Sequence, residues 1–101
     1  MARQGITKSL EGNKPEFVFD AAQVTFKELG WEVYKKRPFA FLVEARTTTS
    51  EGYILANIII TVFGNPGINL TIKSDTASQA TVDDQARKIM AALEKNISKK
   101  K

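Results

Sequence analysis

The chain has 101 residues, of which 43% are hydrophobic and 26% charged, and its formal net charge is +4. This length fits one globular domain and is too short for two. Because the sequence contains neither cysteine nor histidine, it excludes disulfides, thiolate nucleophiles, imidazole bases and zinc sites built on those residues. We therefore expect a protein that is not an enzyme and that has no catalytic, cofactor or metal site.

The positive charge is concentrated at the carboxyl end. Lys99, Lys100 and Lys101 supply three charges, so the net charge of the remaining residues falls from +4 to +1. We interpret residues 98–101 as a basic disordered tail and residues 5–97 as a single domain. No window is long and apolar enough to cross a bilayer, and the absence of cysteine suits a reducing compartment, so we expect a cytoplasmic protein.

The amino-terminal part of the sequence predicts a strand followed by a helix. Residues 5–11 alternate between apolar and polar side chains, which is the period of a strand. Residues 12–15 interrupt that pattern, and Pro15 suits the first turn of a helix because its missing N–H needs no partner there. Apolar residues then recur at helical spacing: Val18, Phe19, Ala22, Thr25, Phe26 and Leu29. This spacing predicts a helix over residues 15–29 that Gly30 closes in the left-handed conformation.

Four further strands are predicted in the middle of the chain. Residues 31–34 begin an extended segment, and the Lys-Lys-Arg-Pro run at 35–38 is typical of a turn. Apolar residues alternate over 39–46 and again over 53–63, which we interpret as a central strand. A Gly-Asn-Pro-Gly cluster then leads to a strand at 68–73, so these last two strands are expected to form a hairpin.

The carboxyl-terminal part predicts a second helix over residues 81–96. Thr81 and Asp84 have the spacing of a capping box, with Asp84 in place of the usual Glu or Gln. The order strand, helix, four strands, helix indicates an α+β fold, a mainly antiparallel four- to five-stranded sheet with both helices packed on one face. We expect the covered face to carry Phe39, Phe41, Val43, Ile54, Ile58, Ile60, Ile68 and Leu70.

The opposite face of this sheet is predicted to be too apolar for plain exposure to solvent. A step of one residue along each strand gives Tyr34, Lys36, Leu42, Arg46, Tyr53, Leu55, Ile59 and Phe63. A contiguous exposed apolar patch on a small domain usually marks a partner surface, although twist or sparse spacing can also leave no continuous patch. We predict a protein-interaction or self-association module whose binding residues are Tyr34, Leu42, Arg46, Tyr53, Leu55, Ile59 and Phe63.

Two other functions stay open at this point. A single-stranded nucleic-acid module would stack bases on Tyr34 and Tyr53 and meet phosphates with Lys35, Lys36 and Arg37. The strands lack the dense aromatic and basic pattern of the common RNA-binding sheet, so nucleic acid is not the favoured partner. A module that binds a small amphiphile is the other alternative, and it needs a hollow between the helices and the sheet.

The order of the elements, with Gly30-Trp31-Glu32-Val33 after the first helix and a capped helix from Thr81, resembles that of small bacterial helix-grip-type domains. These include domains of uncharacterised proteins and of outer-membrane-assembly lipoproteins. The resemblance covers residues 5–97 and concerns architecture, so it implies a fold and carries over no functional residue. The lipoproteins are anchored through a lipidated cysteine, and this chain contains none.

Overall fold

The computed structural model describes residues 2–10, 12–64 and 66–99, with the side chain of Lys99 left aside. Its helices and strands follow one another in the predicted order. They are β1 (Ala2–Ser9), α1 (Pro15–Glu28), β2 (Glu32–Arg37), β3 (Leu42–Thr49), β4 (Gly52–Thr61), β5 (Gly67–Ser74) and α2 (Gln79–Lys99), with a short 3-10 turn at Pro38–Ala40.

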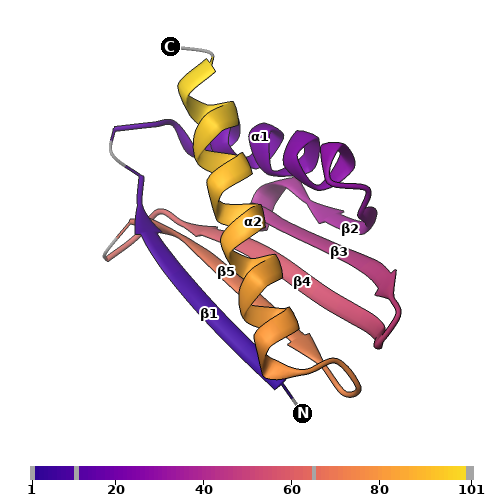
Figure 1. The fold of residues 1–101 in the computed structure, drawn as a ribbon. Coiled ribbons are helices and arrows are strands. Elements are labelled where there is room, and N and C mark those ends of the chain that lie inside the picture. Colours follow the sequence, from indigo (N-terminus) through magenta and orange to yellow (C-terminus); the bar gives the residue numbers. More distant parts are fainter. Residues whose placement is uncertain (1, 11, 65, 100–101) are drawn as a thin grey trace.

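The strands form one sheet in the order β1-β5-β4-β3-β2, and every neighbouring pair is antiparallel. The first strand and the second therefore lie at opposite edges of the sheet, and α1 carries the chain from one edge to the other. Three successive hairpins then return the chain to β1 (Figure 1). The predicted α+β class and the predicted element order are confirmed.

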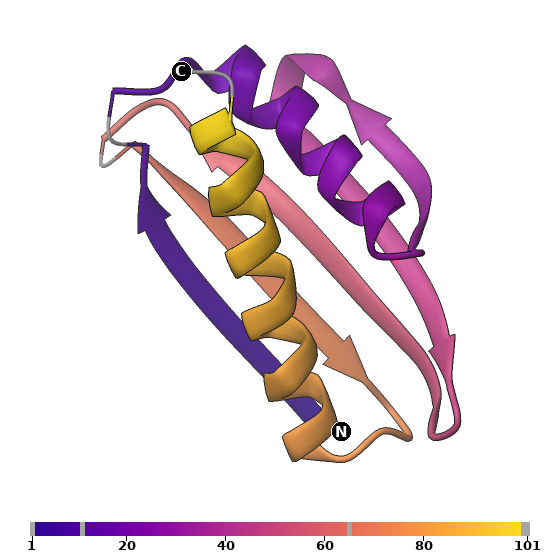
Figure 2. The ribbon, with the colours of Figure 1, turned by 45° about the horizontal axis from the view of Figure 1, so that its top comes forward.

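Both helices pack on the same face of the sheet and divide it between them. Helix α2 lies along β1 and β5, whereas α1 lies over β2, β3 and β4 (Figures 1 and 2). Alternate residues of the inner strands point into this layer and are fully or almost fully buried: Val43, Ala45, Ile54, Ala56, Ile58, Ile60, Ile68, Leu70 and Ile72. Burying an aliphatic side chain of this size contributes about 1.5–3 kcal/mol relative to exposure, so this face is the main source of stability.

The end of α1 closes as the sequence predicts. Gly30 has a φ of 81°, in the left-handed region that a glycine adopts without steric cost. The reversal lets the N–H of Trp31 donate to the carbonyl of Phe26 at 2.8 Å, and the two rings pack at 5.7 Å between centroids. Trp31 thereby closes the core at the start of β2.

The predicted turn at 35–38 is wrong. Lys35 to Arg37 form the end of β2, and the turn is Pro38–Ala40, because proline has no N–H to continue the ladder. Phe41 then adopts a left-handed conformation with a φ of 49°, so β3 begins only at Leu42. As a consequence Phe39 is fully exposed rather than on the covered face, whereas Phe41 packs edge-on against Phe19 at 6.2 Å.

A β-bulge in β2 changes which side chains share a face. The register shifts between Val33 and Lys35, which leaves Tyr34 as the bulged residue. Lys35 then lies opposite Glu44, and Lys36 lies opposite the buried Val43 on the helix side. The predicted placement of Lys36 on the open face is therefore wrong.

Helix α2 begins earlier and ends later than predicted. The hydroxyl of Ser78 accepts the N–H of Thr81 at 3.2 Å, so Ser78 caps the helix instead of Thr81. Because α2 continues to Lys99, Ser98 and Lys99 are helical rather than part of the predicted tail. The rest of that tail, residues 100–101, lies outside the described residues.

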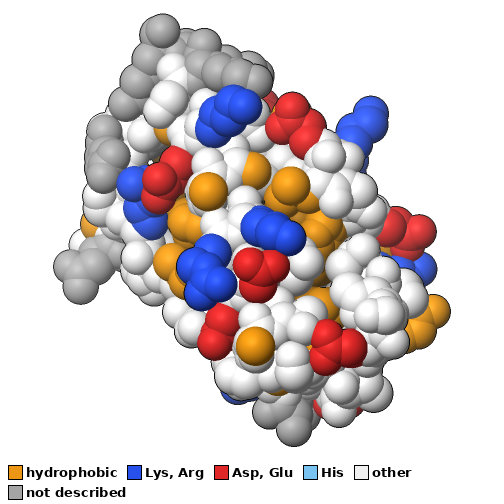
Figure 3. All heavy atoms as spheres, in the orientation of Figure 1, with side chains coloured by type: hydrophobic (Ala, Val, Ile, Leu, Met, Phe, Trp, Pro, Cys, Tyr) orange, Lys and Arg blue, Asp and Glu red, His pale blue; other side chains and the backbone are white. Residues whose placement is uncertain are grey.

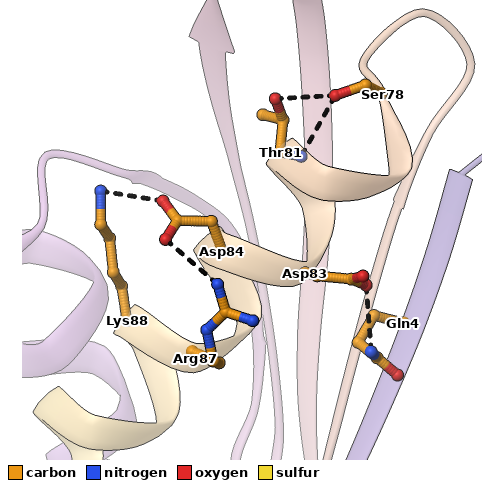
Figure 4. A network of polar contacts seen from close by, with 7 residues as sticks. All are labelled: Gln4, Ser78, Thr81, Asp83, Asp84, Arg87 and Lys88. Carbon is orange, nitrogen blue, oxygen red and sulfur yellow. Dashed lines mark hydrogen bonds and ion pairs between the residues drawn. The ribbon is translucent and has the colours of Figure 1, made fainter.

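The start of α2 is fastened to the outer edge of β1. The side-chain amide of Gln79 accepts the N–H of Arg3 at 3.3 Å and donates to the carbonyl of Arg3 at 2.8 Å. Asp83 accepts a hydrogen bond from the side chain of Gln4 at 3.0 Å (Figure 4). It also accepts one from the side chain of Gln79 at 2.8 Å. The next residue, Asp84, forms ion pairs with Arg87 and Lys88 one turn further along α2, and these lower the pKa of its carboxyl, Lys88 having the larger effect.

Candidate binding face of the sheet

The face of the sheet opposite the helices, hereafter the open face, is covered by neither of them. Residues that lie directly opposite one another in an antiparallel sheet share a face, so the register identifies its members. They include Arg3 and Thr7 from β1; Asn69, Thr71 and Lys73 from β5; Tyr53, Leu55, Asn57 and Ile59 from β4; Leu42, Glu44 and Arg46 from β3; and Glu32, Lys35 and Arg37 from β2. On the helix side, acidic, basic and hydrophobic side chains are interspersed over the surface (Figure 3).

Large apolar side chains gather at one end of the sheet. Leu42 and Ile59 lie directly opposite each other on β3 and β4. Phe39 lies in the turn before β3 and Phe63 follows the end of β4, so both belong to the same end of the sheet. Phe39 is fully exposed, Phe63 is 89% exposed and Ile59 is 39% exposed. We call Phe39, Leu42, Ile59 and Phe63 the apolar end.

A polar row separates the apolar end from the rest of the open face. Glu44, Asn57 and Thr71 lie opposite one another on β3, β4 and β5. Leu55 and Tyr53 lie beyond this row, towards the hairpin that joins β3 and β4. The predicted binding residues are all present on or beside the open face, but they form two groups instead of one continuous patch.

Tyr34 and Arg46 belong to a charged cluster at the β2 edge. The guanidinium of Arg46 lies 5.4 Å from the centre of the Tyr34 ring and also pairs with Glu32 at 2.6 Å. Burial raises the pKa of the Tyr34 hydroxyl, and the carboxylate of Glu44 raises it further, while Arg46 lowers it. The hydroxyl is therefore a neutral hydrogen-bond donor at physiological pH.

The cations of the open face differ in whether they have a carboxylate partner. Arg46 pairs with Glu32, and Lys35 pairs with Glu44 at 3.8 Å. Among the described residues, no ion pair is formed by Arg3, Arg37 or Lys73. Arg3 and Lys73 are moreover direct cross-strand partners on β1 and β5, an arrangement in which like charges repel.

Arg3 and Lys73 line a hollow in the open face. Its volume is about 230 Å³, and its walls are Arg3, Tyr34, Glu44, Leu55, Ala56, Asn57, Thr71 and Lys73. A second hollow of about 420 Å³ shares Leu55 and Lys73 with the first and extends past Tyr53 towards Asp75 and Thr76. We call the first of these the central hollow. Sequence reasoning missed Arg3, because its place beside Lys73 depends on the pairing of β1 with β5, which no local pattern reveals.

A further groove lies on the helix side, between α1 and the edge strand β2. It has a volume of about 350 Å³ and is lined by Gln23, Val24, Lys27, Trp31, Val33 and Lys36. Lys36 therefore faces away from Tyr34, Lys35, Arg37 and Tyr53. The structure does not bring the predicted nucleic-acid residues together on one surface.

Within the part of the chain that the structure describes, no group of three or more acidic side chains is placed to hold a metal ion. None of the described helices is long and apolar enough to span a membrane. Comparison with protein-family models and with curated proteins finds no match to this chain. The resemblance to helix-grip-type domains therefore stays a prediction.

Proposed function

We propose that the protein is a non-catalytic module that associates with a second copy of itself through the apolar end. The observation that carries this proposal is the exposure of Phe39, Ile59 and Phe63 at the end of the sheet where Leu42 lies opposite Ile59. Burial of one such side chain stabilises an association by up to about 1.5–3 kcal/mol before the costs of binding are subtracted. An exposed apolar group of this kind on a small domain is typical of an interface.

Two of the three open-face cations that form no ion pair among the described residues lie away from the apolar end, and the third, Arg37, lies opposite Leu42 beside it. Arg3 and Lys73 lie near the start of β1 and the end of β5, whereas the apolar end lies where β1 finishes and β5 begins. Two copies related by a twofold axis can therefore join their apolar ends while these cations stay far apart. In such a contact the same surface of both copies is used, so no further complementary patch is required.

The test is the mass in solution over a range of protein concentrations, measured by light scattering for the wild type and for variants. We expect the wild-type mass to rise towards that of two chains, and Ile59→Lys to remain at one chain, because a charge would be buried in the contact. Val24→Lys is the matched control, since Val24 is also exposed but lies on α1. It should associate like the wild type.

Two outcomes contradict the proposal. A wild-type protein that stays at one chain throughout the range shows that the apolar end does not join two copies. Equal association of Ile59→Lys and the wild type shows that another surface is used. Circular dichroism of both variants checks that the fold is retained.

Nucleic-acid binding stays an alternative with a smaller set of residues. The Tyr34 ring already contacts Arg46, and Lys36 lies on the helix side, so Tyr53, Lys35 and Arg37 are what the open face retains from the predicted set. An oligonucleotide arm in the experiment described next distinguishes this alternative.

A further inference from the structure

We infer that the central hollow binds a phosphate group of a small phosphorylated molecule, held between the guanidinium of Arg3 and the ammonium of Lys73. This inference does not depend on the proposed self-association, because the central hollow and the apolar end lie in different parts of the sheet and share no residue.

The two cations form a pair of like charges. Arg3 and Lys73 are opposite each other across β1 and β5, and like charges in this position destabilise a sheet. Neither forms an ion pair with a carboxylate among the described residues, in contrast to Arg46 and Lys35 on the same face. A bound dianion would remove this repulsion, and a guanidinium is well shaped for a phosphate because it donates in a planar fork.

Neutral hydrogen-bonding groups line the hollow beside the pair. Asn57 and Thr71 are cross-strand partners on β4 and β5, both are half-buried, and both line the central hollow. The amide of Asn57, the hydroxyl of Thr71 and the hydroxyl of Tyr34 all offer donors to an anion. All three side chains already line the central hollow, so they can contact one bound anion together.

The remaining walls of the central hollow indicate what the rest of the ligand carries. Glu44 also lines the central hollow, where its carboxylate pairs with Lys35 and is an acceptor that keeps anionic groups towards Arg3 and Lys73. Leu55 and the Tyr34 ring supply apolar surface beside it, and the neighbouring hollow past Tyr53 gives further space. The ligand that fits is a phosphomonoester whose other part carries hydroxyl or amino donors and a flat or apolar group, as a mononucleotide does.

Adenosine monophosphate is a suitable probe, and adenosine is its control without the phosphate. Titration of the labelled protein is followed by amide NMR shifts. We expect adenosine monophosphate to shift the amides of Asn57, Thr71 and Lys73 in a saturable way, inorganic phosphate to shift them more weakly, and adenosine to leave them unchanged. Lys73→Gln and Arg3→Gln should each weaken binding by about tenfold, since each removes a charged hydrogen-bond donor.

Lys36→Gln is the matched control, because Lys36 is an exposed cation on the other side of the sheet and its loss should leave the affinity unchanged. Loss of affinity in Lys36→Gln equal to that in Lys73→Gln overturns the inference, since it would indicate only a general charge effect. The absence of saturable shifts at millimolar adenosine monophosphate also overturns it.

A final arm uses a short single-stranded oligonucleotide at several salt concentrations. A site with two cations gives a shallow salt dependence, whereas a nucleic-acid surface that neutralises many phosphates gives a steep one. If the oligonucleotide binds with a steep salt dependence and adenosine monophosphate does not bind, the small-molecule site is overturned and the nucleic-acid alternative is favoured.

Discussion

The two faces of the sheet are built from neighbouring residues and yet have opposite properties. Ile58 and Ile59 follow each other on β4, but Ile58 is completely buried under the helices and Ile59 is 39% exposed on the open face. On the covered face almost every inward position is aliphatic, while the open face mixes aromatic, charged and amide side chains. The comparison shows that the buried core of this fold lies on one side of the sheet, whereas large side chains on the other side remain partly exposed.

The largest effect should separate this isoleucine pair. Ile58→Ala leaves a cavity in a fully packed layer, so we expect a loss of about 2–5 kcal/mol in the free energy of unfolding. Ile59→Ala removes a side chain that is already partly in water, and its loss should stay below about 1 kcal/mol. Urea denaturation of both variants measures the difference. Equal losses would contradict the conclusion that the covered face contributes more to stability than the open face.

A smaller effect should follow from the contact between the two covering helices. Asn96 on α2 donates to the hydroxyl of Thr25 and to the carboxylate of Glu28 on α1, both at 2.8 Å, and Asn96 is buried. Asn96→Ala should lower the free energy of unfolding by about 1–3 kcal/mol, because the hydroxyl of Thr25 is buried and loses a hydrogen-bond donor that water does not replace. Ser98→Ala, at an exposed site in the same helix, should change it by less than about 0.5 kcal/mol. Chemical denaturation of both variants measures how much this polar contact between α1 and α2 contributes to the free energy of unfolding.

On the open face, removing a charge should increase stability. Lys73→Gln eliminates the like-charge pair with Arg3, so we expect a gain of about 0.2–1 kcal/mol at low salt. The gain should shrink as salt is added, because both side chains are exposed and their repulsion is screened. Thermal denaturation at several salt concentrations provides the measurement. A loss of stability in Lys73→Gln would show that the pair is already compensated.

The smallest effect concerns the connection between the β3–β4 hairpin and the covering helix. The hydroxyl of Thr81 and the N–H of Ser78 both donate to the carboxylate of Glu51, and these bonds lower the pKa of that exposed group, Thr81 having the larger effect. A lowered pKa contributes stability that is present above the ordinary value and is lost as the pH falls through the folded value. The wild type should therefore lose slightly more stability than Glu51→Gln between about pH 5 and pH 3. The measurement is the free energy of unfolding of the wild type and of Glu51→Gln as the pH is lowered. An equal loss in both proteins would contradict the prediction.

The parts of the fold that follow from local periodicity could be predicted from the sequence. The helical spacing of Val18, Ala22 and Thr25, and the alternation through Ile54, Ile58 and Ile60, depend only on side chains a few residues apart. Their burial in the structure agrees with both patterns.

The errors arose where the backbone departs from regular geometry. The bulge at Tyr34 moves Lys36 to the helix side, and the turn at Pro38–Ala40 with the left-handed Phe41 leaves Phe39 exposed. Nothing in the alternation of residues 31–46 marks either irregularity. Likewise, Thr81 has a good capping sequence, but Ser78 has the hydroxyl that accepts the free N–H.

The central hollow could not be predicted for another reason. Arg3 and Lys73 are far apart in sequence, and only the long-range pairing of β1 with β5 brings them together. The open face could be anticipated as a binding surface from its apolar residues, but its division by the polar row of Glu44, Asn57 and Thr71 depends on the register of three strands.

The bulge in β2 also limits how the protein can assemble. A strand from another molecule can extend a sheet only where an edge offers a regular series of N–H and carbonyl groups, and the bulge interrupts that series midway along a short, highly charged strand. At the other edge, the backbone groups of Arg3 are already bonded to Gln79. Copies joined through the apolar end should therefore stop at a closed pair instead of growing edge to edge into fibres.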